Sequence, residues 1–355
     1  MRHLKSHLKF HPRVKPLTSL RGRSFLSTTD LSSRDMLALI ELTIAGKHSG
    51  REAFGSPLHG RGVGLVFFNP SLRTRASMIM AVSQLGGQPV PLEVGAGTWD
   101  LEHRTGVVMD GAKSEHVREA VPVLAQYVDA IGVRCFPALK SLSGDRQDPV
   151  LRAFAQYSPV PVINLESAMH HPCQALADMV TIRERLGGFK GRKVSLVWAN
   201  HPKVLPHAVP NSFILAALQC GLDLTVAAPP EYQPDDDFRA VMQQTALTGG
   251  GSVRCITDRD AAYDGAQVIY AKSWASTVYY GHSERDLACR ANYRHWQVTS
   301  ELMQRTDSGI FMHCLPVRRN VVVADSVLDS SASVVVEQAA NRLAAQKALL
   351  ASIFS

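Results

Sequence analysis

Short apolar segments alternate with helical patterns along most of the chain. The apolar runs have the length of strands, and several are bounded by glycine or proline. Alternation of this kind predicts parallel sheets covered by helices on both faces, and the length of 355 residues allows two such sheets. The expected fold class is α/β, with two doubly wound parallel-sheet domains joined by helices. The strand-like runs are 62–68, 88–92, 130–133, 160–164, 194–198, 224–228, 268–271 and 310–313.

A helical pattern at 174–186 marks the expected boundary between the domains. It ends at Gly187 and Gly188, and a new alternation of strand and helix begins just beyond them. A final helical pattern is long enough to pack back across the first domain. We expect a disordered basic leader at 1–23, a first domain at 24–170, a second domain at 171–334 and this C-terminal helix at 335–355.

Composition places the chain among globular proteins rather than disordered or fibrous ones, with 45% hydrophobic and 19% charged residues. No run of 18 uncharged apolar residues occurs, so no membrane-spanning helix is predicted. The six cysteines are scattered without a CxxC pair, which argues against a disulfide framework and a zinc site. We therefore expect a protein of a reducing compartment, the cytoplasm, with no metal or other cofactor.

The net charge of +7 is concentrated at the N-terminal end. Residues 1–23 carry seven basic residues and no acidic one, so the rest of the chain holds 31 of each. A neutral body argues against a nucleic-acid partner, although the leader keeps a non-catalytic anion-binding or nucleic-acid-binding protein as the alternative class. The leader itself is interpreted as a transit peptide, a disordered arm or an over-long translation start.

The segment FFNPSLRTRAS is the strongest local pattern. A buried strand ends at Asn69-Pro70, and a helix begins within 71–75. The start of a helix offers unpaired backbone N–H groups and a positive dipole end, which suit a phosphate. Hydroxyl and guanidinium groups in the same segment add further donors. The pattern predicts an anion site, with an N-capped helix carrying exposed arginines as the structural alternative.

Two further segments place polar residues near strand ends. HPCQALAD opens the bridging helix, where His171 can donate to a reacting carbonyl oxygen and Gln174 can hold an adjacent amide. The structural alternative for His171 is a helix cap or a surface residue. Cys173 fits a small buried apolar residue as well as a reactive thiol. FMHCLPVRRN follows an apolar strand, so Arg318 is expected to reach an anion. A solvated turn is the alternative there.

Taken together, the three segments resemble the aspartate/ornithine carbamoyltransferase family in order, spacing and residue type from Ser24 to the C-terminus. The resemblance implies a carbamoyl-phosphate domain followed by an amino-substrate domain, and a homotrimer with active sites between subunits. It implies catalytic roles for Thr74, Arg134 and His171 around the carbamoyl oxygen. The residues that it implies for carbamoyl phosphate are Ser71, Leu72, Arg73, Thr74, Arg75, Trp99, Arg134, His171, Gln174 and Arg318.

The acceptor side departs from the common ornithine type. After the strand VSLVWA the chain reads NHPKVLPHAVPNS, and the Asp-x-x-x-Ser-Met-Gly type of loop that serves a free α-amino group is missing. This segment resembles the N-acylornithine carbamoyltransferases, as do GTWDLE, VVMDGAKSEH and IYAKSWAS. Trp99 in that group reaches a neighbouring subunit's site. Without the resemblance, a buried glutamate, a loop histidine and a strand-end lysine are structural alternatives. The residues implied for the acylornithine are Ser114, Glu166, His201, Lys272, Cys314 and Leu315.

Ser114 bears on the acyl group, because acetyl-type members resemble this stretch but carry a glutamate there. A carboxylate would repel succinate, whereas serine removes the repulsion and can also cap the helix that starts at Glu115. Two further features lead to the same interpretation: Val322 stands in place of the acetyl-type lysine, and His171 follows Glu166 by five positions rather than four. We expect N-succinylornithine as the acceptor, with N-acetylornithine and then plain ornithine or aspartate as alternatives.

Overall fold

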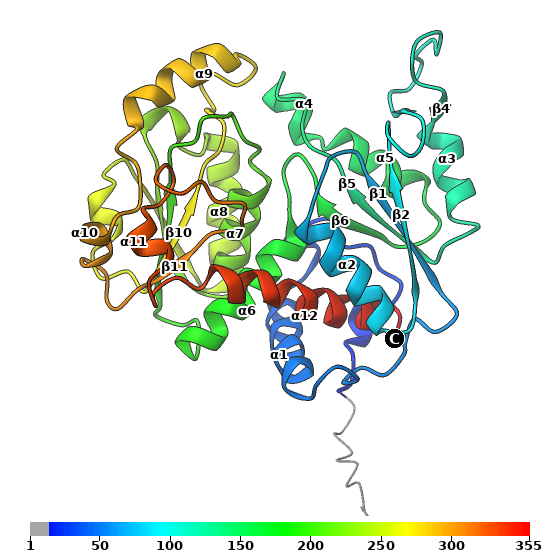
Figure 1. Ribbon diagram of the computed structural model, residues 1–355, viewed down its shortest axis with the longest axis horizontal. Coiled ribbons are helices and arrows are strands. Elements are labelled where there is room, and N and C mark those ends of the chain that lie inside the picture. The colour runs from blue at the N-terminus through cyan, green and yellow to red at the C-terminus, as the bar shows by residue number, and fades with distance from the viewer. Residues whose placement is uncertain (1–13) are drawn as a thin grey trace, which may run out of the picture.

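Two parallel sheets organise residues 14–355, the part of the chain that the computed structural model describes (Figure 1). The first sheet has the strand order β2-β1-β5-β6 and the second has the order β11-β10-β7-β8-β9. A small ladder pairs β3 (Leu101–Glu102) with β4 (Glu115–His116). The predicted α/β class with two parallel-sheet domains is confirmed.

The first sheet is formed by β1 (Gly62–Phe67), β2 (Gln88–Glu93), β5 (Ala130–Arg134) and β6 (Val162–Glu166). Its central strands, β1 and β5, are buried along almost their whole length because helices cover the sheet. The helices of this half are α1 (Ser33–His48), α2 (Arg73–Gln84), α3 (Val117–Leu124), α4 (Leu142–Arg146) and α5 (Pro149–Tyr157).

The second sheet is formed by β7 (Lys193–Trp198), β8 (Asp223–Ala227), β9 (Ser252–Ile256), β10 (Val268–Lys272) and β11 (Ile310–Met312). The helices of this half are α7 (Ala208–Gln219), α8 (Asp236–Gly249), α9 (Ser283–Arg290), α10 (Ser300–Met303) and α11 (Asp325–Leu328). Short 3-10 turns lie at Thr18–Leu20, Thr28–Asp30, Pro230–Tyr232, Asp260–Ala262 and Ala291–Tyr293.

Two helices join the halves. The residues of α6 (Pro172–Leu186) are buried from Pro172 to Ile182, because α1, α7 and α12 (Val335–Ile353) pack around it. In Figure 1, α12 runs from the second lobe across the seam toward α2 of the first. Side chains on α6 and α12 can therefore meet groups at the strand ends of both sheets.

The structure describes only the second part of the predicted leader, because residues 1–13 lie outside the described residues. Its second part is packed rather than disordered, which corrects the expectation for residues 14–23. Leu20 is buried, the Leu17 N–H donates to Ser352 Oγ (3.1 Å), and the Gly22 N–H donates to the Ile353 carbonyl (2.9 Å). Apolar burial and pairing with the end of α12 hold this stretch in place. Of the helices in residues 14–355, none has the length and hydrophobicity needed to cross a bilayer.

Candidate active site

A cavity of about 570 Å³ lies where the carboxyl ends of both sheets meet the starts of α2 and α6. Ligands of open α/β sheets bind at such ends. Most of the predicted site residues line this cavity. They are Ser71, Arg73, Thr74, Arg134, Glu166, His171, Gln174, His201, Lys272, Cys314, Leu315 and Arg318.

The loop after β1 supplies part of the cavity wall. Ser71 Oγ accepts from the Thr74 N–H (3.2 Å). This hydrogen bond satisfies a backbone N–H in the first turn of α2. Arg73 points into the cavity, and burial lowers the pKa of its guanidinium. Two predicted residues face elsewhere: Leu72 is 79% exposed, and Arg75 pairs with Glu93 and lies over the Phe67 ring. Both line a neighbouring hollow instead.

Three charged or polar side chains converge at the ends of β5 and β6. The buried Arg134 guanidinium pairs with the Glu166 carboxylate, and His171 Nε2 lies 3.5 Å from Glu166 Oε2. The His171 N–H donates to Ser212 Oγ (2.7 Å), which fixes the backbone at the start of α6. Burial, followed by the nearby Arg342 and Arg134, holds the pKa of His171 well below its usual range. The imidazole is therefore neutral at neutral pH and can donate one hydrogen bond.

Arg342 on α12 is a cavity residue that the sequence interpretation missed. It is buried, and its two terminal guanidinium nitrogens donate to Gln174 Oε1 (3.1 Å) and Thr74 Oγ1 (2.7 Å). The Gln174 amide donates in turn to Asp178 Oδ1 (2.8 Å). Burial raises the pKa of Asp178 to about 6. No sequence pattern pointed to Arg342, because α12 carries two basic residues, Arg342 and Lys347, and only the first lines the cavity.

The second-domain half of the cavity comes from loops after β7, β10 and β11. Lys272 ends β10, is buried, and donates to the Ser273 carbonyl (2.9 Å), and burial lowers its pKa. His201 Nε2 accepts from Arg318 Nε (3.2 Å), and burial lowers the pKa of His201 to about 4. His313, which the sequence interpretation also missed, is buried beside them and lines the same cavity.

Trp99 and Ser114 do not line the cavity of this chain. Trp99 is 58% exposed and donates through Nε1 to Glu115 Oε2 (2.6 Å), and Ser114 is exposed. Both belong to the segment around β3 and β4, which projects from the first lobe in Figure 1. A single chain therefore brings most of the predicted site residues together, but not Leu72, Arg75, Trp99 and Ser114.

Charge in the cavity is strongly one-sided. Its wall holds six cationic side chains and one carboxylate, Glu166, which is already paired with Arg134. Such a wall favours a ligand that carries more than one negative charge. Neutral donors beside it, His171 and Gln174, suit the oxygen and amide of a small acyl group. The cations are Arg73, Arg134, Lys203, Lys272, Arg318 and Arg342.

Fold and cavity together indicate an enzyme that handles a small anionic donor, and family comparison makes this specific. Residues 23–184 match the carbamoyl-P binding domain of aspartate/ornithine carbamoyltransferase, and residues 190–353 match its Asp/Orn binding domain. The chain belongs to this family, so the predicted family and the prediction of a carbamoyltransferase enzyme are confirmed.

The relatives place the chain in the N-acylornithine branch, which confirms that prediction as well. The N-acetylornithine carbamoyltransferase of Xanthomonas axonopodis pv. citri is 43% identical over 336 residues, covering 94% of this chain and 97% of the relative. The N-succinylornithine carbamoyltransferase of Bacteroides thetaiotaomicron is 40% identical over 278 residues, covering 78% and 82%. A crystal structure of acetylornithine transcarbamylase with acetylcitrulline superposes with a TM-score of 0.89 at 43% identity, covering 93% and 99%.

Proposed function

We propose that this enzyme transfers the carbamoyl group of carbamoyl phosphate to the side-chain amine of N-succinyl-L-ornithine. The products are N-succinyl-L-citrulline and phosphate, a step of arginine biosynthesis in the cytoplasm. The observation that carries the proposal is the cavity wall of six cations and one paired carboxylate at the facing ends of two parallel sheets. We also propose the division into domains at 24–170 and 171–334, with α12 packing back on the first.

The chemistry follows from the direction in which charge moves. The uncharged amine attacks the carbamoyl carbon, its C–N bond forms, and negative charge grows on the carbamoyl oxygen. Arg134, His171 and the Thr74 hydroxyl are the donors assigned to that oxygen, and Gln174 is assigned to the carbamoyl amide. The C–O bond to phosphate then breaks, and phosphate leaves with the bonding pair and takes up the amine proton. Ser71, Arg73 and Arg318 are assigned to the phosphate oxygens.

The acceptor is assigned to the second-domain side. Lys272 and His201 suit the α-carboxylate of the acylornithine, and Glu166, Cys314 and Leu315 are assigned to its remaining atoms. Trp99 and Ser114 are exposed and do not line the cavity of their own chain. We propose a homotrimer in which these two residues, together with Leu72 and Arg75, complete the cavity of a neighbouring subunit.

N-acetylornithine is the second candidate acceptor, because the relatives with 43% identity are N-acetylornithine carbamoyltransferases. Crystal structures of glutamate-replaced variants of N-acetyl-L-ornithine transcarbamylase contain carbamyl phosphate and N-succinyl-L-norvaline. That finding supports a link between a lost carboxylate and a succinyl ligand. The deciding test supplies carbamoyl phosphate with ornithine, N-acetylornithine or N-succinylornithine and measures the citrulline product. Faster turnover of N-acetylornithine would overturn the succinyl assignment.

Replacing Ser114 by glutamate is expected to reverse the acyl preference. A carboxylate at this position would repel the distal carboxylate of the succinyl group, so kcat/KM for N-succinylornithine should fall about 10-fold or more. The value for N-acetylornithine should change by less than about threefold. Parallel kinetics with the two acceptors measure this, and Ser114→Ala is the control for loss of the hydroxyl. Equal losses for both acceptors would contradict the proposed role.

The pH dependence of kcat/KM should show no titration of an active-site histidine. His171 and His201 have lowered pKa values, His201 to about 4, so both lose their protons well below pH 6.5 and stay neutral above it. The acceptor amine resembles that of lysine, with a pKa of about 10.4, so its reactive uncharged fraction rises tenfold per pH unit. We expect log kcat/KM for the acceptor to rise with a slope near one from about pH 6 to 9. A break near pH 6.5 would mean that one of these histidines titrates during turnover.

A further inference from the structure

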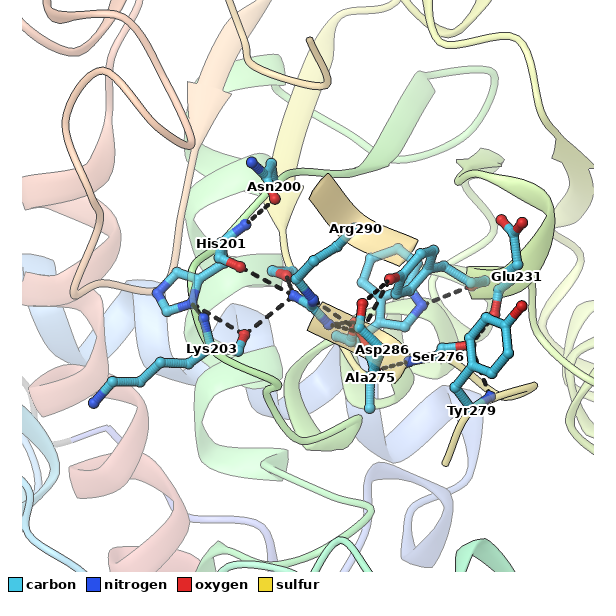
Figure 2. Close-up of polar contacts among 12 residues, drawn as sticks. Asn200, His201, Lys203, Glu231, Ala275, Ser276, Tyr279, Asp286 and Arg290 are labelled. Atoms are coloured by element: carbon cyan, nitrogen blue, oxygen red, sulfur yellow. Dashed lines mark hydrogen bonds and ion pairs between the residues drawn. The ribbon is translucent and has the colours of Figure 1, made fainter. Parts of the chain in front are cut away.

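Arg290, the last residue of α9, forms a buried pair with Asp286 one helical turn earlier (Figure 2). The two residues, Arg290 and Asp286, are 2% and 1% exposed. The Arg290 Nε donates to Asp286 Oδ1 at 2.9 Å, and one terminal nitrogen donates to the same oxygen at 2.5 Å. Neither residue lines the active-site cavity, and the mechanism proposed above does not use either of them.

The other donors of Arg290 reach two loops that do line the cavity. Nη1 donates to the carbonyls of His201 (3.3 Å) and Lys203 (3.1 Å) in the loop after β7. Nη1 also donates to Ser273 Oγ (3.2 Å), and Nη2 to the Trp274 carbonyl (3.4 Å), in the loop after β10. Figure 2 shows this guanidinium between the His201–Lys203 loop and Asp286. One planar group therefore ties together the two loops that carry His201 and Lys272.

Asp286 holds the guanidinium in a fixed orientation. Its Oδ2 accepts from the Ser276 N–H (2.7 Å), and its Oδ1 also accepts from the Tyr232 hydroxyl (3.0 Å). The rings of Trp198 and Tyr232 lie 5.7 and 5.4 Å from the guanidinium carbon. A guanidinium that is fixed by a carboxylate and two aromatic rings has little freedom left, so the loop carbonyls that it binds are held with it.

We propose that Arg290 is a positioning residue for the acceptor, acting through the loops at His201–Lys203 and Lys272–Trp274. The inference rests on the proposed function, because it takes His201 and Lys272 as contacts of the acylornithine. It predicts that a change at Arg290 raises KM for the acylornithine and leaves KM for carbamoyl phosphate nearly unchanged. Among the described residues, Arg290 makes no hydrogen bond to the donor half of the cavity, which is formed by Ser71 to Thr74, Arg134 and Arg342.

The test replaces Arg290 by lysine, which keeps the charge opposite Asp286 but cannot span the four loop acceptors. We expect KM for the acylornithine to rise about 10-fold, with KM for carbamoyl phosphate within about twofold of wild type. Arg305→Lys is the matched control, because Arg305 forms the same kind of pair with Asp264 at the surface. That control should leave both KM values unchanged.

A second variant keeps the inference testable if Arg290→Lys does not fold. Asp286→Asn retains Arg290 but removes the carboxylate that fixes its orientation. KM for the acylornithine should therefore rise about threefold, while KM for carbamoyl phosphate stays unchanged. Equal rises in both KM values, or a lower Tm with unchanged KM values, would overturn the inference. Absence of turnover by the wild-type enzyme with either acylornithine would instead overturn the proposed function, so the two failures are distinguishable.

Discussion

Replacing Arg134 by methionine is expected to lower kcat by about 10²–10³-fold, the usual cost of losing one donor to a developing oxyanion. Arg134 ends β5, is 7% exposed, and points into the cavity beside Glu166 and His171. Its guanidinium lies 4.5 Å from the Phe136 ring centre, so it is held in place before any substrate binds. A donor fixed in advance lowers the barrier without reorganising during the reaction.

Single-turnover kinetics with saturating substrates measure this loss. KM for carbamoyl phosphate should change less than kcat, because the interaction strengthens as charge develops on the carbamoyl oxygen. Methionine leaves the Glu166 carboxylate without its cation, so the double variant with Glu166→Gln separates that side effect from the loss of the donor. A loss of kcat below about fivefold in the double variant would rule out direct stabilisation by Arg134.

The motifs at the carboxyl ends of strands could be predicted because each combines a buried apolar run with polar residues that follow it. A buried apolar run followed by Ser71–Arg75, or by His171 and Gln174, places polar groups at the carboxyl end of a parallel strand whatever the details of packing. The alternation of strands and helices likewise predicted both sheets. Strand β9 was missed because it is an edge strand with alternating exposure, and its sequence SVRCI lacks a continuous apolar run.

The remaining site residues depend on long-range packing that no local pattern encodes. Arg342 reaches the cavity because α12 crosses the seam between the lobes and lies against α2 and α6. Residues 14–23 are held by the far end of that same helix, so their order depends on a segment distant in sequence. Arg75 was expected among the phosphate ligands, yet it lies on a different face of α2 from Thr74 and pairs with Glu93.

Replacing Arg342 by methionine is expected to reduce kcat/KM for carbamoyl phosphate by about 10²–10³-fold without lowering the Tm. The recorded partners of the Arg342 guanidinium, Gln174 and Thr74, are uncharged, and its Nε has no partner among the described residues. Burial lowers its pKa, as expected for a cation that lacks a full counter-charge. An apolar side chain of similar size removes this unfavourable burial, so the free energy of unfolding should rise or stay the same.

Lys347 on the same helix provides the control. It is nearly as buried as Arg342, but it donates to the Arg51 carbonyl (2.7 Å) and does not line the cavity. Lys347→Met should therefore leave kcat/KM within about twofold of wild type, whatever it does to the Tm.

Steady-state kinetics and thermal unfolding of both variants, with and without phosphate, separate the two roles. The phosphate-induced rise in Tm should persist in Lys347→Met and become smaller in Arg342→Met, because of these two residues only Arg342 contributes its charge to the cavity. An unchanged phosphate effect in Arg342→Met would show that α12 supports the fold without contributing to anion binding.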